Sequence, residues 1–271
     1  MEQTLQYISK TLLQHDVTDA GPGLLYGNMG IAVFFFHYAR FTGNQSYRDH
    51  AVVLTNRCIK NQTWPQCSIN YSNGLAGIGA GVEYLAQNGY IKADTNKALK
   101  GFDQCIFFSA VYGDRSDASL YTGLAGLGRY SLFRIAGQGA NDDHIGILNN
   151  KMLLIHITDI FERIYPALNG MTCTDVASFL YAVEQANIYP SKVKWLLKRF
   201  EAGSSSFHQK VKQAEQNTEA MYCGKYRQLQ YAMQRNIQPD IIPGLYGGLA
   251  GAGLYLLSKM DKQHESWKQL L

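Results

Sequence analysis

The sequence has few charged residues and an odd number of cysteines. Charged residues make up only 17% of the 271 residues while hydrophobic residues make up 46%, which excludes an intrinsically disordered chain. The five cysteines lie far apart and form no CxxC pair, so a disulfide framework is not expected and a reducing compartment fits better. The length suits one large domain or two small ones.

Targeting and membrane-spanning segments are also missing. The first residues, MEQTLQYISKTLLQHD, have no basic region followed by an apolar region, so we expect no signal peptide. The most apolar window, residues 23–39, is shorter than the roughly 18 to 20 residues that cross a bilayer, and it contains Asn28 and His37. We therefore expect a cytoplasmic protein without a membrane span.

The net charge of +4 comes from scattered basic residues. Their densest cluster is SKVKWLLKRFEAG at 191–203, where Lys192, Lys194, Lys198 and Arg199 surround an apolar stripe. This pattern is typical of the solvated face of a surface helix more than of a nucleic-acid patch. We expect no nucleic-acid partner.

Glycine is abundant and recurs in one pattern. A GxxG pair opens an apolar run at residues 27, 74, 123 and 248, and a degenerate copy lies near 171, with Met171 and Thr174 in the glycine positions. No copy is followed by GK[ST] or has GxGxxG spacing, which argues against a phosphate-binding loop. We expect the glycines to allow close packing. They are Gly27, Gly30, Gly74, Gly77, Gly123, Gly126, Gly248 and Gly251.

Each copy has the pattern of a helical hairpin. An apolar helix follows the GxxG, a turn rich in Asn, Asp or Ser comes next, and a second helix with one polar face completes the unit. No stretch alternates as a strand would. The sequence predicts one all-α domain over 1–271, an α/α toroid of about five hairpins with the apolar helices inside. The repeats span roughly 22–62, 69–112, 118–166, a degenerate 170–238, and 242–271, and an N-terminal helix over 1–15 closes the ring.

The glycine-opened repeats resemble the lanthionine synthetase C-like (LanC-like) family. The resemblance is carried by LLYGNMGIAVFFFHYARFTGN, SINYSNGLAGIGAGVEYLAQNG, SLYTGLAGLGRYSLFRI and PGLYGGLAGAGLYLLSKM. It covers residues 22–139 and 241–260 well and 170–240 poorly. The family's toroid fold agrees with the hairpin pattern.

The resemblance implies peptide chemistry. Family members in bacteriocin pathways add cysteine thiols to dehydrated Ser or Thr in a precursor peptide, using zinc held by two cysteines and one histidine. The corresponding positions here hold Tyr26, Ser72-Asn73, Tyr121-Thr122 and Tyr246-Gly247, none of which is a ligand pair. Cys223 in MYCGKY is a weak candidate ligand without a CHG partner. We expect no metal and no other cofactor.

A binding site is expected at one end of the toroid. If the inner helices run parallel, their N-termini, with free N–H groups and dipoles, face one funnel that favours an extended peptide. The side chains before the glycine pairs would line its mouth: Tyr26, Asn28, Tyr71, Asn73, Tyr121, Thr122 and Tyr246. The alternative is that Asn73 and Thr122 cap their helices and the tyrosines fill gaps.

Three functions remain open, in this order. The first is a LanC-like protein of a lanthipeptide-type pathway that binds a peptide substrate or precursor in the funnel, with a peptide-modifying enzyme as a further candidate partner. The second is an active thioether cyclase with a rebuilt zinc site. The third is a carbohydrate-active α/α-barrel enzyme, which needs two carboxylates about 5 to 10 Å apart. Its candidates are Glu83, Asp114, Asp117, Asp175 and Glu184.

Overall fold

The helices that follow the glycine pairs are largely buried. The computed structural model describes residues 1–14, 20–60, 68–113, 116–137, 144–168, 170–202, 207–235, 237 and 242–271. In it the glycine-opened helices and the degenerate copy are α2 (Asn28–Thr42), α4 (Leu75–Gln87), α6 (Leu124–Gly137), α8 (Gly170–Gln185) and α11 (Leu249–Met260). In α4 every residue from Leu75 to Leu85 is buried, as an apolar run without a polar face requires.

The remaining elements are helical as well. They are α1 (Glu2–Gln14), α3 (Gln45–Lys60), α5 (Thr95–Tyr112), α7 (His144–Ile164), α9 (Pro190–Ala202), α10 (Phe207–Arg235) and the 3₁₀ helices η1 (Tyr165–Ala167) and η2 (Lys262–Leu270). α5 shows why: Asp94 caps its first turn, and Leu99, Phe102 and Ile106 lie on one buried face. The described residues contain no strand, which confirms the all-α prediction. No helix in this part of the chain has the length and apolarity needed to cross a membrane.

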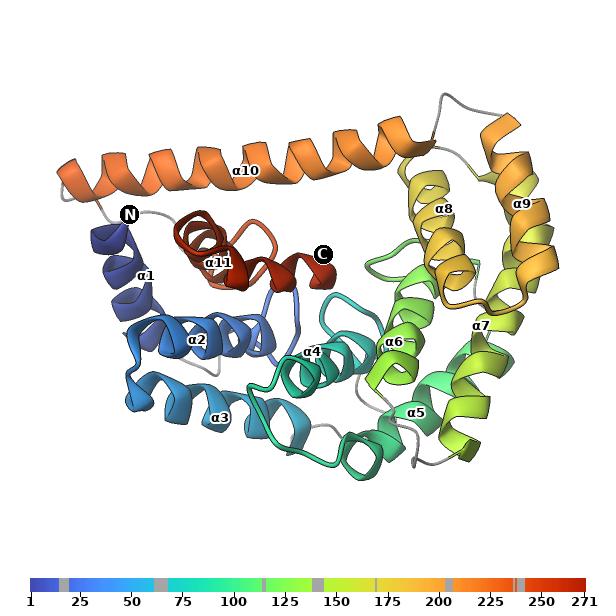
Figure 1. Ribbon diagram of the computed structural model, residues 1–271, viewed down its shortest axis with the longest axis horizontal. Helices are drawn as coiled ribbons and strands as arrows, with labels where there is room; N and C mark the ends of the chain where they lie inside the picture. Colours follow the sequence, from blue (N-terminus) through green and yellow to red (C-terminus); the bar gives the residue numbers. More distant parts are fainter. Residues whose placement is uncertain are drawn as a thin grey trace. The chain divides into compact units, whose positions relative to one another are not determined.

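The chain divides into two compact units, and unit 1 combines its two ends. It comprises residues 1–66 and 216–271. Within it α2 packs against α3 and α11, and α11 also contacts α1 and η2 (Figure 1). The N-terminal helix thus packs on the first helix of the last repeat. Closure of a five-hairpin ring stays a prediction.

Unit 2, residues 67–215, contains three consecutive hairpins. α6 lies between α4 and α8, and the outer helices α5, α7 and α9 contact α4, α6 and α8 in turn (Figure 1). The inner helices are the apolar ones and the outer helices are amphipathic, as the sequence pattern predicts.

The insertion before the last repeat forms one long helix. Of the insertion, residues 203–206, 236 and 238 lie outside the described part, and α10 spans 29 residues between them. In unit 1 the Tyr222 hydroxyl on α10 donates a 2.7 Å hydrogen bond to the Leu245 carbonyl, and its ring packs edge-on against Trp267 at 5.5 Å. This part of α10 is therefore packed against the last repeat.

Two histidines link α2 to η2 inside unit 1. Nδ1 of His37 lies 2.9 Å from Nδ1 of His264, and both side chains are fully buried. A hydrogen bond between two imidazole nitrogens requires one N–H and one bare nitrogen, so at least one ring of the pair is neutral. Burial, then the neighbouring His264, then Arg40 lower the pKa of His37 well below its usual value. The pKa of His264 is lowered by burial, a shift that Asp261 opposes and Arg40 reinforces.

Acidification is therefore expected to destabilise the protein through this pair. Because both folded-state pKa values are lowered, the unfolded chain takes up protons first, and stability falls as pH drops below the unfolded value of about 6.5. The loss is at most about 1.4 kcal/mol per pH unit for each histidine. Urea unfolding at pH 7.5 and 5.5 should show a smaller loss for His37→Gln than for the native protein. His156→Gln, on α7, is the control, and equal losses in all three proteins would contradict the interpretation.

Candidate functional site

The loops before the inner helices fold back onto the helix N-termini. Three N–H groups of the first turn of α4 donate to loop carbonyls, and three of α11 do the same. The pairs are Leu75 to Ser68, Ala76 to Ile69, Gly77 to Asn70, Leu249 to Ile242, Ala250 to Pro243 and Gly251 to Gly244, at 2.7–3.5 Å. The expectation of free N–H groups at these helix ends is therefore wrong, because the chain itself occupies them.

The loops can fold back in this way because the first residue of each GxxG pair is glycine. A Cβ on Gly74 would lie 2.3 Å from the Ser68 carbonyl oxygen, and one on Gly123 would lie 2.3 Å from the Asp117 carbonyl oxygen. A Cβ on Gly248 would meet the Gly244 carbonyl oxygen at the same distance. At these glycines the backbone that approaches closely belongs to the loop more than to a neighbouring helix.

The third glycine, five residues later, receives an aromatic ring from the next inner helix. In unit 2 a Cβ on Gly79 would lie 2.4 Å from the ring of Tyr130, and one on Gly128 would lie 2.2 Å from the ring of Phe179. In unit 1 Gly253 faces Phe34 in the same way. The helices α2, α6 and α8 thus each fit a ring into a gap that only glycine leaves.

These contacts set the register of the degenerate copy. Gly126, the second glycine of its repeat, faces Tyr71 of the preceding repeat. Tyr71 lies three positions before Gly74, the first glycine of that preceding repeat. In α8 it is Asp175 that reaches the equivalent residue, accepting a 2.9 Å hydrogen bond from the Leu120 N–H. The glycine positions of this copy are therefore Thr172 and Asp175, one residue later than Met171 and Thr174.

In unit 2 the four predicted mouth residues lie on two loops joined by a backbone hydrogen bond, from the Ser72 N–H to the Tyr121 carbonyl, at 3.0 Å. Asn73 is exposed and its side chain makes no hydrogen bond within the described residues, while Tyr71 is fully buried. The exposed Thr122 hydroxyl donates to Asp117 at 2.6 Å. Asn73 and Thr122 are not the N-cap residues, because Gly74 directly precedes α4 and Gly123 directly precedes α6.

The structure adds an arginine to this end of unit 2. Arg129 on α6 lies over the Tyr71 ring, 5.9 Å from its centroid, at a position that is apolar in the other three glycine-opened copies. The pKa of Asp175 is raised by burial and also by the charge of Asp117, while the Leu120 N–H and the charge of Arg129 lower it. Sequence reasoning missed Arg129, although a charged residue inside an apolar helix is the signal that could have shown it.

In unit 1 the three predicted residues form a smaller group. Tyr26 is 40% exposed and packs edge-on against Tyr246, with ring centroids 6.3 Å apart. The Tyr246 N–H donates to the Leu25 carbonyl at 2.8 Å, which matches the loop-to-loop bond of unit 2. Asn28 begins α2 and is buried. The ring pair is the exposed part of this group.

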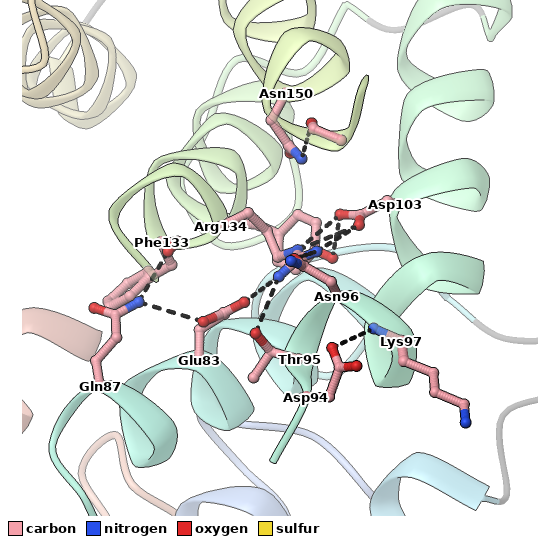
Figure 2. A network of polar contacts seen from close by, with 12 residues as sticks. Glu83, Gln87, Asp94, Thr95, Asn96, Lys97, Asp103, Phe133, Arg134 and Asn150 are labelled. Carbon is pink, nitrogen blue, oxygen red and sulfur yellow. Dashed lines mark hydrogen bonds and ion pairs between the residues drawn. The ribbon is translucent and has the colours of Figure 1, made fainter. Parts of the chain in front are cut away.

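Of the carboxylates named for the carbohydrate-enzyme alternative, Glu83 is engaged in a buried ion pair. Glu83 is buried deep in α4, where it makes an ion pair with Arg134 of α6 (Figure 2). Arg134 also bonds Asp103 of α5 at 2.9 Å, and Asp103 accepts a 2.7 Å bond from the Tyr130 hydroxyl. Glu83 and Asp103 thus share one buried cation, which is a structural arrangement. Asp114 lies outside the described residues.

The described residues do not fit the zinc site of the resembled family. Across them, no three His, Cys, Asp or Glu side chains come together as a metal ion would require. Cys223 is half-buried on α10 and lies close to Tyr255, a side chain that does not ligate zinc in such sites.

Comparison with known protein families gives a match over much of the chain. Residues 18–187, which make up 170 of the 271 residues, match the family described as Lanthionine synthetase C-like protein. The matched range includes α2, α4, α6 and α8 with their loops. No curated protein matches the chain significantly.

Proposed function

Because the chain belongs to the lanthionine synthetase C-like (LanC-like) family, we propose that it binds a peptide in a peptide-modification pathway. The family match over residues 18–187 carries this proposal. The family's chemistry joins side chains of a polypeptide, so a precursor peptide is the ligand class that membership implies.

The loops before the inner helices are the proposed contact surface. Their exposed side chains include the Tyr26 ring beside Tyr246 in unit 1 and the Asn73 amide in unit 2. A phenol ring offers flat contact area at a low cost in conformational entropy, and an amide can bond the peptide backbone as donor and acceptor. Loop carbonyls already accept the hydrogen bonds of the helix N–H groups. A bound peptide would therefore form its polar contacts with these side chains.

In the proposed function the protein acts without zinc. The positions that correspond to the family's ligand motifs hold Tyr, Ser, Asn, Thr and Gly. Cys223 has Tyr255 beside it. A thiol nucleophile made by zinc coordination therefore has no support from the described residues, whereas peptide binding requires only the loop surface.

Binding should weaken when the loop side chains are truncated. The probe is a fluorescein-labelled peptide of about twelve residues, rich in Cys, Ser and Thr, measured by anisotropy; the full-length protein is used. Tyr26→Ala and Asn73→Ala are each expected to weaken binding about tenfold. Tyr112→Ala and Asn149→Ala, on outer helices, are the matched controls and should bind as the native protein does.

Two results would overturn the proposal. Equal affinity of all five proteins, or no binding at all, would contradict peptide binding at these loops. About one zinc per chain in the purified, tag-free protein, lost in Cys223→Ala, would instead indicate a rebuilt metal site and a cyclase.

A further inference from the structure

The outer helix α9 has one buried apolar face and one exposed face of basic and aromatic residues. Val193, Leu196, Leu197 and Phe200 are buried in unit 2. The opposite side consists of Lys192, Lys194, Trp195, Lys198 and Arg199, which we call the α9 basic face. The face thus combines four basic side chains with one exposed tryptophan.

The indole of this face is held between two cations. Trp195 is 42% exposed, and the Lys192 ammonium and the Arg199 guanidinium lie over its ring at 5.4 and 4.6 Å from the centroid. Lys192 precedes Trp195 by almost one turn and Arg199 follows by one turn, so the ring is fixed from both sides along the helix. Its orientation is therefore set before any partner binds.

Most of the positive charge of this face is not neutralised. Lys192 forms an ion pair with Glu162 of α7. Lys194, Lys198 and Arg199 form no ion pair within the described part of the chain. Three cations are thus available on two turns of one helix.

The turn that leads into α9 adds a second exposed ring. Tyr189, directly before Pro190, has a φ of 51° and Asn187 has a φ of 52°, both in the left-handed region. This conformation costs energy for a tyrosine, and it leaves the ring 37% exposed next to the basic face.

We propose that the α9 basic face binds the headgroups of anionic phospholipids at a membrane surface. Lys194, Lys198 and Arg199 would contact lipid phosphates, while Trp195 and Tyr189 would lie at the headgroup level, where amphipathic rings are favoured. Cations already cover the indole ring, so stacking of a nucleic-acid base on it, which needs an open face, is disfavoured.

The test is sedimentation of the full-length protein with phosphatidylcholine vesicles, with and without about one third phosphatidylserine. Lys194→Glu/Lys198→Glu is compared with Lys97→Glu/Lys100→Glu on α5, where both lysines are exposed. Each double variant lowers the net charge by four, from +4 to 0. The α9 variant should bind anionic vesicles at least about 25-fold more weakly, since each cation contributes about fivefold. The α5 variant should bind nearly as the native protein does.

A spectroscopic readout locates the contact. Trp267 is buried, and Trp64 lies outside the described residues. Vesicle binding should shift the native fluorescence to shorter wavelength, and Trp195→Phe should abolish that shift. Absence of native binding, or equal loss in both double variants, would overturn the proposal. Binding of a polyglutamate peptide without binding of vesicles would overturn it in favour of an acidic protein partner.

Discussion

Replacing Arg134 by methionine is expected to lower the free energy of unfolding by about 3–5 kcal/mol. The guanidinium is 1% exposed and binds Glu83, which is equally buried, together with Asp103. Truncating the cation leaves Glu83 charged inside the protein without its partner. The loss comes mainly from that stranded charge and less from the absent hydrogen bonds.

Urea unfolding of three variants separates this cause from a general effect of the substitution. Arg227→Met, at an exposed position of α10, should change stability little. Adding Glu83→Gln to Arg134→Met removes the stranded charge and should restore part of the loss. If Arg134→Met is as stable as Arg227→Met, the network of Figure 2 does not hold α4, α5 and α6 together.

Replacing Gly126 by alanine is the second change with a large expected effect, a destabilisation of about 3 kcal/mol or more. The added Cβ would lie 2.1 Å from the Leu120 carbonyl oxygen and 2.6 Å from the Tyr71 Cβ. Neither atom is the end of a flexible side chain, so the loop before α6 must move away from the helix. That movement would also disturb the contact between Leu120 and Asp175.

Gly101 provides a matched control in the same unit. It lies in the interior of α5, and an added Cβ would meet nothing within 4 Å. Gly101→Ala should therefore stabilise the protein by about 0.5–1 kcal/mol, because alanine loses less backbone entropy in a helix. Thermal unfolding of both variants measures the difference, and a destabilised Gly101→Ala or an unaffected Gly126→Ala would contradict the packing interpretation.

The position of the inner helices followed from local signals. An apolar run after a GxxG pair predicts a buried helix, and α2, α4 and α11 begin at the residue after Gly27, Gly74 and Gly248. The all-α class followed from the missing strand alternation. The family followed from four such runs at a regular step, and residues 18–187 match it.

The polar residues within these helices could not be assigned in the same way. Glu83 was considered as a catalytic carboxylate because its distance from Arg134, 51 residues along the chain, could not be inferred from periodicity. Arg129 near Tyr71 and the one-residue register shift to Asp175 depend equally on which helices become neighbours.

The sequence by itself determined the helix pairs, their apolar and amphipathic faces, and their glycine-opened starts, because these depend on residues within one or two helical turns. Tertiary structure alone decided what the glycines face. Gly74 accommodates a returning carbonyl and Gly79 a ring from α6. It also decided that loop carbonyls occupy the helix N–H groups, which leaves exposed side chains such as Asn73 to recognise a partner. Such contacts join residues distant in sequence, and their geometry is set by packing of whole elements.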